Sequence, residues 1–376
     1  MQKYGNISKS RNIHIKKLNL RPHSFIHSKF IRETIMSKQI DRTSKEPLYK
    51  QLVSNVVRGI REGELHPGDI LPSMNDLALQ LDISRETVKK AYNILTSKGI
   101  VTPKQGKGFY IAEPSSDSRP HILLLFDKFS DYKQILFNAF DKQLDNSAEL
   151  TILVHNQDIN LLKHYLDNHL DMYDYYILTP HFPLDETSQL MAAKQIARIP
   201  NRKLIMLDKI QAELPGRYGA VYQDFENDIF NGLAQGLEDL KKVRMLRVIT
   251  LPQSLYGQMV QKGVKNFTDK YNIPVEFRTT IPDDICKSDC FLLLNSQLDA
   301  GLVELSQKIT SAGMNIGTDV KIISYNDVDL NELVIGGLTT VSTDFREMGR
   351  MAAEMIRQHK MEKVHCPFRM NRRRTF

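Results

Sequence analysis

Residues 71–111 constrain the fold more than any other stretch, because they hold two helix-start signals, a short connection and a glycine-marked basic hairpin. Ser73 is followed three residues later by Asp76, which resembles a capping box in which side chains satisfy the unpaired N–H groups of a helix start. This pattern predicts a helix that runs to about Leu81. Asp82 and Ile83 then form a short connection to a second helix start.

The second predicted helix begins after Ser84, a residue type favoured as an N-cap. Its apolar residues recur at helical spacing and are expected to share one buried face: Val88, Ala91, Tyr92 and Leu95. Its polar and basic residues are left to point elsewhere: Arg85, Glu86, Thr87, Lys89 and Lys90. Two short helices joined by so brief a turn must cross, and the second one projects. The geometry is that of a helix-turn-helix.

A two-stranded wing is predicted after this pair. The segments IVTP and FYI alternate apolar and polar residues on either side of residues 104–108. Glycines at the tip, including Gly106, permit positive φ. Lys104 and Lys107 are placed at that tip.

Residues 47–111 resemble the GntR family of winged-helix transcription regulators. PLYKQLVSNVVRGIREGELHPGDILPS is similar to the first helix of that family and its approach to the second. The family usually has Glu-Arg after Pro-Ser, whereas this chain has Met74-Asn75, so its operator sequence need not follow that of better-known members. The resemblance implies DNA contacts from nine residues: Ser73, Asn75, Ser84, Arg85, Thr87, Lys89, Lys104, Gly106 and Lys107. The alternative is a helical pair built for protein contacts.

The net charge of +7 belongs mainly to the N-terminal tail. Residues 1–40 contain nine Lys or Arg and a single acid, Glu33, so the rest of the chain is close to neutral. Three readings of the tail stay open: a DNA-binding arm, an organellar transit segment, or an extension upstream of the true start. We favour the last, because Met36 opens a natural lead-in to the first winged-helix element. The tail lacks the apolar core of a secretory signal.

The cysteine content gives no support for a metal site or for secretion. Cys286, Cys290 and Cys366 form an odd set without a secretion signal, as in a reducing cytoplasm. No His or second Cys pair lies at zinc-site spacing around them. No run of apolar residues is long enough to span a membrane. We therefore expect a cytoplasmic protein with no metal and no cofactor.

A change of pattern marks the second half of the chain. At 376 residues the chain exceeds the size of one hydrophobic core. We expect a basic tail (1–40), a winged-helix domain (41–112), a linker (113–120) and a second domain (121–376). In the last, seven short apolar runs alternate with amphipathic stretches: 122–126, 150–154, 175–178, 204–207, 246–249, 291–294 and 322–325. This βαβ alternation predicts an α/β fold of parallel sheets in two lobes.

Ligands of open α/β sheets bind beyond the carboxyl ends of the strands. The polar and aromatic residues found there can match hydroxyl groups while rings cover an apolar sugar face: Asp127, Phe129, His181, Asp208, Asp224, Tyr256, Asn295, Gln297, Asn326 and Asp327. The alternative is that several of them merely cap the next helix.

Residues 289–356 resemble the ligand domain of LacI/GalR regulators, which is similar to periplasmic sugar-binding proteins. The resemblance lies in a strand, a polar ligand residue, a helix, a Gly turn, a further strand, and a Leu-Thr-Thr segment before the last helix. The family usually ends that further strand with two aspartates, whereas this chain has Asn326-Asp327. The resemblance implies a two-lobed, periplasmic-binding-protein-like fold. The family usually has an arginine three residues before a Gly-aromatic pair. In this chain Val260 stands three residues before Gly263-Val264, so that arginine is absent. A neutral polyol or sugar is therefore expected.

The sequence predicts a regulator that is not an enzyme. The effector-binding half has no G-x-G-x-x-G, no phosphate-binding loop and no G-x-S-x-G nucleophile elbow. We expect a homodimer that binds a two-fold symmetric DNA operator, most simply as a repressor, with operator affinity switched by a small sugar-like effector. The alternative is a sugar-binding or transport component without DNA function. We expect the C-terminal arginines to be a solvated tail: Arg369, Arg372, Arg373 and Arg374.

Overall fold

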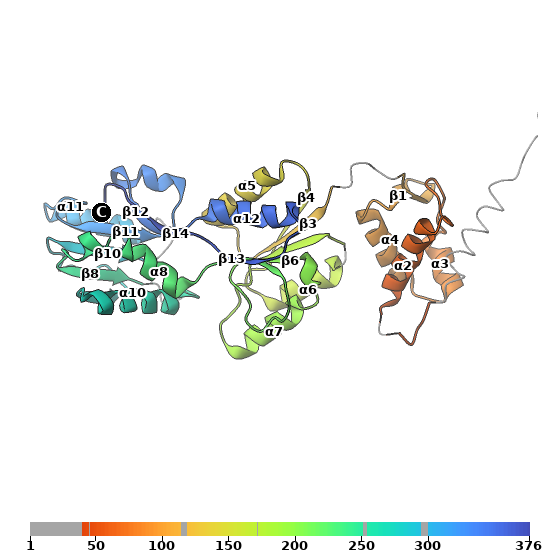
Figure 1. Ribbon diagram of the computed structural model, residues 1–376, viewed down its shortest axis with the longest axis horizontal. Coiled ribbons are helices and arrows are strands. Elements are labelled where there is room, and N and C mark those ends of the chain that lie inside the picture. Colours follow the sequence, from red (N-terminus) through yellow and green to blue (C-terminus); the bar gives the residue numbers. More distant parts are fainter. Residues whose placement is uncertain (1–39, 45, 114–118, 171, 251–253, 295–299) are drawn as a thin grey trace, which may run out of the picture. The chain divides into compact units, whose positions relative to one another are not determined.

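The computed structural model describes residues 40–44, 46–113, 119–170, 172–250, 254–294 and 300–376, and divides the chain into two compact units, 1–118 and 119–376 (Figure 1). The expected N-terminal tail and most of the expected linker lie outside the described residues. None of the described helices combines the length and apolar character needed to cross a bilayer.

The first unit is a three-helix head followed by a hairpin. Its elements are α2 (Leu48–Arg61), α3 (Met74–Leu81), α4 (Arg85–Ser97), β1 (Val101–Lys104) and β2 (Gly108–Ile111). The strands pair antiparallel, and Ile70 adds an isolated antiparallel bridge to Tyr110. Tyr92 is fully buried, and its hydroxyl donates to the carbonyl of Pro72 at 2.7 Å. The core of the head therefore also fixes the entrance to α3.

Both predicted caps of the helix pair are present. Ser73 Oγ accepts from the N–H of Asp76, and Ser84 Oγ accepts from the N–H of Thr87, each at 3.1 Å. Asp82 ends α3 in the left-handed region, with φ of 49°, which turns the chain into α4 within two residues. The predicted helix-turn-helix is confirmed.

The second unit contains two α/β lobes. Lobe one is a parallel sheet in the order β13-β7-β6-β5-β3-β4. Its elements are β3 (His121–Phe126), α5 (Asp131–Leu144), β4 (Glu149–Val154), α6 (Ile159–His169), β5 (Tyr175–Leu178), α7 (Glu186–Ile196), the 3-10 turn η1 (Asn201–Lys203), β6 (Leu204–Asp208), β7 (Gly219–Tyr222), α12 (Phe345–Arg357) and β13 (Lys363–His365).

Lobe two has the sheet order β14-β12-β11-β10-β8-β9, parallel except for β14 against β12. Its elements are α8 (Phe225–Ala234), α9 (Leu237–Leu240), β8 (Met245–Ile249), α10 (Gly257–Tyr271), β9 (Val275–Arg278), β10 (Asp289–Leu293), α11 (Ala300–Ser311), β11 (Lys321–Tyr325), the 3-10 turns η2 (Asp329–Glu332) and η3 (Val334–Gly336), β12 (Thr339–Thr343) and β14 (Phe368–Asn371). The predicted α/β fold in two lobes is confirmed.

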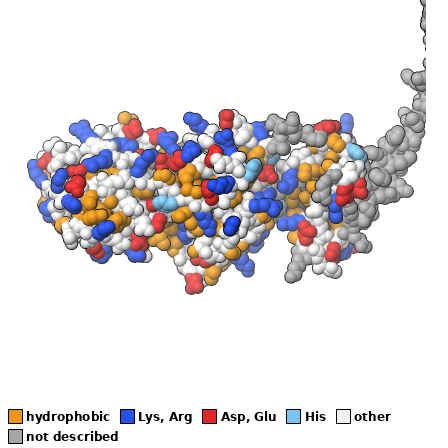
Figure 2. Space-filling view, viewed as in Figure 1, with side chains coloured by type: hydrophobic (Ala, Val, Ile, Leu, Met, Phe, Trp, Pro, Cys, Tyr) orange, Lys and Arg blue, Asp and Glu red, His pale blue; other side chains and the backbone are white. Residues whose placement is uncertain are grey.

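Helices cover both faces of each sheet, which explains why the central strands are apolar throughout. In β3, Ile122, Leu124 and Phe126 pack toward α5 and α12, whereas Leu123 and Leu125 pack toward α6 and α7. Figure 1 shows α5 and α12 on one face of this sheet and α6 and α7 on the other. In lobe two, α8 and α10 cover one face and α11 the other. On the surface shown in Figure 2, acidic and basic side chains of this unit are interspersed.

Within the described residues the chain passes between the lobes three times: from β7 to α8, from β12 to α12, and from β13 to β14. The crossings are hydrogen-bonded to one another. The N–H of Cys366 donates to the carbonyl of Tyr222 at 2.8 Å, and that of Asp344 to Pro367 at 2.9 Å. Adjacent crossings of this kind can act as a hinge.

The expectation of a solvated C-terminal tail is wrong. Arg369 lies in β14 and pairs with Asp344, Arg372 pairs with Asp239, and Thr375 is fully buried. The C-terminal residues 372–376, which follow β14, are called the strap below. Gly317 makes room for it, because a Cβ there would lie 2.2 Å from the carbonyl oxygen of Arg374. The acidic residues that pair with these arginines are distant in sequence. The run of arginines alone therefore led to the wrong prediction of a solvated tail.

Candidate functional site

Helix α4 presents a basic face to solvent. Val88, Ala91 and Tyr92 are buried, while Arg85 and Lys89 are exposed. Ser84 is exposed and Thr87 is half-buried, with their hydroxyls 2.7 Å apart. Lys89 Nζ lies 3.6 Å from Glu86, a solvent-exposed contact too weak to hold the ammonium away from a phosphate. The first turn of α4 is thus free to meet a ligand.

The wing tip presents two further cations. Lys104, Gly106 and Lys107 are exposed, and Gly106 has a φ of 69°, which the tight turn requires. The ammonium of Lys104 lies 4.5 Å from the centre of the Tyr110 ring. Ser73 and Asn75 are also exposed, at the start of α3. Every residue predicted to contact DNA therefore reaches solvent, at least in part.

A cavity of about 350 Å³ lies between the two lobes. Five of the ten predicted ligand residues line it: Asp127, His181, Asp208, Tyr256 and Asn326. Its other lining residues are Lys128, Tyr132, Gln157, Gln223, Phe225, Thr250, Ser254, Leu255, Gly257, Val260, Leu294, Tyr325 and Phe345. They come from both lobes and, at Gln223, from the crossing between β7 and α8. A ligand in this cavity would contact the groups that must move if the lobes close.

A buried ionic cluster forms the floor of the cavity on its lobe-one side. Lys133, on the inner face of α5, pairs with Asp208 and lies 3.7 Å from Asp127. Burial lowers the pKa of Lys133 to about 8, against the opposing effect of Asp127, so its ammonium remains mostly protonated at pH 7. Burial opposes ionisation of Asp127, but Lys133 and a hydrogen bond from Thr179 lower its pKa below the usual value. The floor is therefore charged.

His181 joins this cluster to lobe two. Burial, reinforced by Lys133, lowers its pKa to about 3, so its imidazole is neutral near pH 7. Nε2 lies 3.1 Å from Asp208 and Nδ1 lies 2.8 Å from the Tyr256 hydroxyl. The carboxylate can only accept, so Nε2 carries the hydrogen and Tyr256 donates to Nδ1. The Tyr256 ring stacks on Phe225, with centroids 4.2 Å apart.

Lobe two offers two buried oxygen atoms without partners. Within the described part of the chain, no hydrogen-bond partner reaches the hydroxyl of Tyr325 or Oδ1 of Asn326, and both residues line the cavity. Burial raises the pKa of Tyr325, so its phenol stays protonated. Unpaired buried polar groups are costly, and a hydroxyl-bearing ligand can satisfy them.

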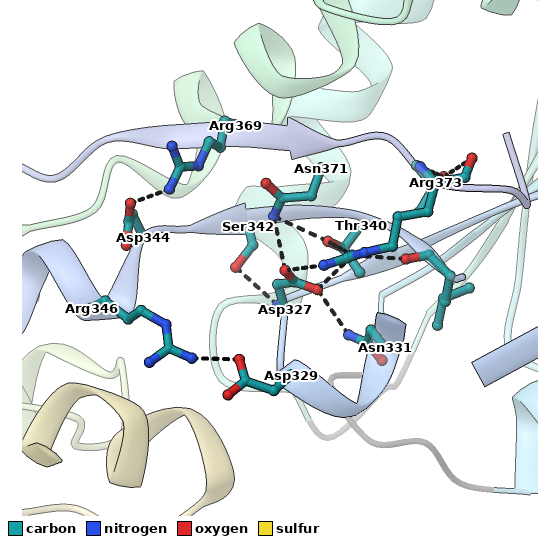
Figure 3. A network of polar contacts seen from close by, with 12 residues as sticks. Asp327, Asp329, Asn331, Thr340, Ser342, Asp344, Arg346, Arg369, Asn371 and Arg373 are labelled. Carbon is teal, nitrogen blue, oxygen red and sulfur yellow. Dashed lines mark hydrogen bonds and ion pairs between the residues drawn. The ribbon is translucent and has the colours of Figure 1, made fainter. Parts of the chain in front are cut away.

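Three of the other predicted ligand residues lie outside the lining of this cavity. Phe129 packs near Phe126 and Phe137 and is 48% exposed. Asp224 caps α8 by accepting from the N–H of Asn227. Asp327 borders a smaller hollow of about 100 Å³ and pairs with Arg373 (Figure 3). Asn295 and Gln297 lie outside the described residues.

Sequence reasoning missed several lining or floor residues because it looked only after strands. Tyr132, Phe225 and Phe345 stand at or near helix starts, and Tyr325 ends a strand. Lys133 gave a usable signal. It shares the helical face of the buried apolar residues of α5, where an unpaired lysine would not be tolerated.

Comparison with known proteins agrees with this anatomy. Residues 48–111 match the family model for bacterial regulatory proteins of the gntR family. The head is a GntR-type helix-turn-helix domain. Residues 294–370 match the model for a periplasmic binding protein-like domain. The chain therefore combines these two domain types.

Relatives with known names match the GntR-type head. The HTH-type transcriptional repressor YtrA of Bacillus subtilis (strain 168) is 39% identical over 75 residues, which are 20% of this chain and 58% of that protein. The mannosyl-D-glycerate transport/metabolism system repressor MngR of Escherichia coli (strain K12) is 31% identical over 107 residues, 28% of this chain and 41% of that protein. The chain thus spans less than two thirds of these curated relatives.

The second unit, residues 119–376, is similar in fold to a known repressor. A crystal structure of the lac repressor dimer bound to operator and an anti-inducer has a TM-score of 0.53 and 16% sequence identity, covering 69% of this chain and 95% of that one. At this identity the likeness concerns the fold alone.

Proposed function

We propose that this chain is a sequence-specific DNA-binding transcription regulator, a repressor, whose operator affinity is switched by a neutral sugar-like effector. The observation that carries the proposal is the presence of a GntR-type head with an exposed basic first turn on α4 and a polar interlobe cavity in one chain. The named relatives are transcriptional repressors, which supports the same reading.

We propose that DNA is contacted by α4 and the wing. Arg85, Thr87 and Lys89 would face bases or phosphates in the major groove, and Lys104 and Lys107 would follow the backbone. One small head gives little specificity, so the regulator is proposed to act as a homodimer in the cytoplasm, on half-sites about 34 Å apart or a multiple of that distance.

The lining of the cavity supports a neutral effector rich in hydroxyl groups. Its charged residues are Asp127, Asp208 and Lys128, and no arginine that could clamp a phosphate or carboxylate lines it among the described residues. Aromatic rings of Tyr132, Phe225 and Tyr256 can cover apolar sugar faces. The volume is at the lower end of the roughly 300–1,000 Å³ range of small-molecule pockets.

The decisive experiment measures operator and effector binding together. Operator fragments are selected from genomic DNA, and their affinity is followed by fluorescence anisotropy with salt, since phosphate contacts make binding steeply salt-dependent. Thermal shift then screens D-glucose, D-galactose, D-mannose, D-xylose, L-arabinose and L-fucose, because a ligand that prefers the folded state raises its stability. A saturating hit must change operator affinity, and operator must change sugar affinity by the same factor.

Failure of either arm rejects part of the proposal. Unchanged operator affinity at saturating sugar would rule out the switch. Sugar binding with no salt-dependent DNA binding would favour the alternative, a sugar-binding or transport component, for which the GntR-type head has no use.

A further inference from the structure

We infer that Arg373 is a positioning residue of the effector cavity: by clamping Asp327, it holds the neighbouring Asn326 in the conformation that turns its carboxamide to the cavity. This inference rests on the proposed function, because it assigns to that cavity a residue outside its lining.

The clamp is a two-pronged ion pair. Arg373 Nη1 lies 2.9 Å from Asp327 Oδ1, and Nη2 lies 2.9 Å from Oδ2. Asn331 and Asn371 each add a hydrogen bond of 3.1 Å to the same carboxylate (Figure 3). With four donors on its two oxygens, Asp327 has little capacity left for a sugar hydroxyl. Asp327 is therefore held by these donors and does not itself bind the effector.

Arg373 is itself anchored along the strap that follows β14. Its N–H donates to Thr339 Oγ1 at 2.8 Å, and its carbonyl accepts from the same hydroxyl at 3.1 Å. Two residues later, the carbonyl of Thr375 accepts from the N–H of Ile322 in β11 at 2.8 Å. Gly337 lets the strap approach, because a Cβ there would lie 3.2 Å from the Cβ of Arg373. The guanidinium therefore projects from a fixed backbone.

The backbone of Asn326 is left-handed and is held by hydrogen bonds. Its φ is 68°, in a region that asparagine enters more readily than most residues other than glycine. Its own N–H donates to Val341, and the next N–H, that of Asp327, donates to Ser342 Oγ at 3.0 Å. The Arg373 clamp fixes the side chain of Asp327, the residue that follows Asn326. Asn326 lines the cavity, and its Oδ1 is buried without a hydrogen-bond partner among the described residues.

The test compares Arg373→Gln with Arg372→Gln, a matched control on the same strap. Arg372 also pairs with an acid, Asp239, but in an exposed contact outside the cavity lining. Isothermal titration is performed with the full chain and whichever of the six aldoses binds it. Arg373→Gln is expected to weaken sugar binding roughly 10- to 100-fold, as when the partner that orients a ligating group is lost. Operator affinity without sugar should stay as in the wild type. Equal sugar affinity for the two variants would overturn the inference.

A double-mutant cycle separates positioning from a general loss of stability. If Arg373 acts through Asn326, Arg373→Gln should cause no further loss of affinity in an Asn326→Ala background. Additive losses would mean that Arg373 acts by another route, and the inference would be wrong. If the wild-type chain binds none of the aldoses, the sugar proposal fails before any variant is compared.

A structural measurement tests the inference without a ligand. In a crystal structure of the Arg373→Gln chain, Asn326 is expected to leave the left-handed region or to turn its carboxamide from the cavity. An Asn326 that keeps its φ and its side-chain position would overturn the inference, whatever the titrations show. The Arg372→Gln structure serves as the control and should leave Asn326 in place.

Discussion

At the scale of single residues, His181 has the clearest consequence for stability. Its folded pKa of about 3 lies below the ordinary histidine value of 6.5, so below about pH 6.5 the unfolded chain binds a proton that the folded chain does not. The stabilisation is fully present above pH 6.5 and is lost as the pH falls toward 3. Urea unfolding should therefore show a His181 contribution of up to about 1.4 kcal/mol per pH unit within this window.

His181→Gln should remove that contribution, so the stability difference between variant and wild type narrows as the pH falls from 7 to 5. His164→Gln, at an exposed position in lobe one, is the control and should keep the wild-type slope. Parallel pH profiles for His181→Gln and wild type would contradict the neutral, buried assignment.

Arg85, at the first position of α4, carries the residue-scale prediction for DNA. Arg85→Ala should weaken binding to the selected operator by about 1–3 kcal/mol and relax the preference at one base position if the side chain reads a base. A uniform loss over all sequences would assign it to a phosphate. Lys98→Ala removes the same charge at the opposite end of α4 and should change neither affinity nor preference.

At the scale of elements, the pairing of α5 with α12 depends on one glycine. A Cβ at Gly349 would lie 2.2 Å from the carbonyl oxygen of Leu136, so the two helices could not approach as they do. Gly349→Ala should lower the free energy of unfolding by about 1–3 kcal/mol through overpacking. Chemical denaturation measures the change. Arg350→Ala, on the exposed side of α12, should have little effect, and equal losses in the two variants would refute the close approach.

The elements that the sequence predicted well are those whose apolar pattern is complete. The seven predicted strands all occur, and β5 has the predicted bounds, because strands buried on both faces must be apolar throughout. β12 was missed as a strand because its sequence is TTVST, although all five residues are buried. Its hydroxyls are satisfied by segments distant in the chain, such as Thr339 by Arg373. No local pattern encodes such a partner.

The candidate site, like the strands, was predictable from the sequence only in part. Asp127, His181 and Asn326 follow strands and do line the cavity. Asp327 follows the same strand, yet Arg373, far along the chain, occupies its carboxylate. A strand end therefore marks where a ligand residue can stand. Which side chain remains free depends on tertiary partners.

At the scale of the whole molecule, Tyr256 reaches from lobe two to His181 in lobe one with a hydrogen bond of 2.8 Å. Tyr256→Phe should destabilise the arrangement of the lobes in this structure relative to a more open one by about 0.5–1.5 kcal/mol, because His181 Nδ1 loses its donor. Spin labels at exposed positions 168 and 269, in a Cys286→Ser background, report the distance between the lobes. We expect a larger population of long distances.

Tyr173→Phe is the matched control, since Tyr173 packs near Tyr176 in lobe one, outside the cavity lining. It should leave the distance distribution as in the wild type. An unchanged distribution for Tyr256→Phe would show that this hydrogen bond does not hold the lobes together.

The three crossings between the lobes also govern how the protein can be made. Lobe one is completed by α12 and β13, which the ribosome delivers only after all of lobe two up to β12. Until then the buried faces of Met348, Ala352 and Ile356 are missing from the core that α5 covers. During synthesis, lobe one therefore stays incomplete, with apolar surface exposed, until the last tenth of the chain is made. A premature stop before residue 345 would thus deprive both lobes, not merely the distal one, of their finished cores.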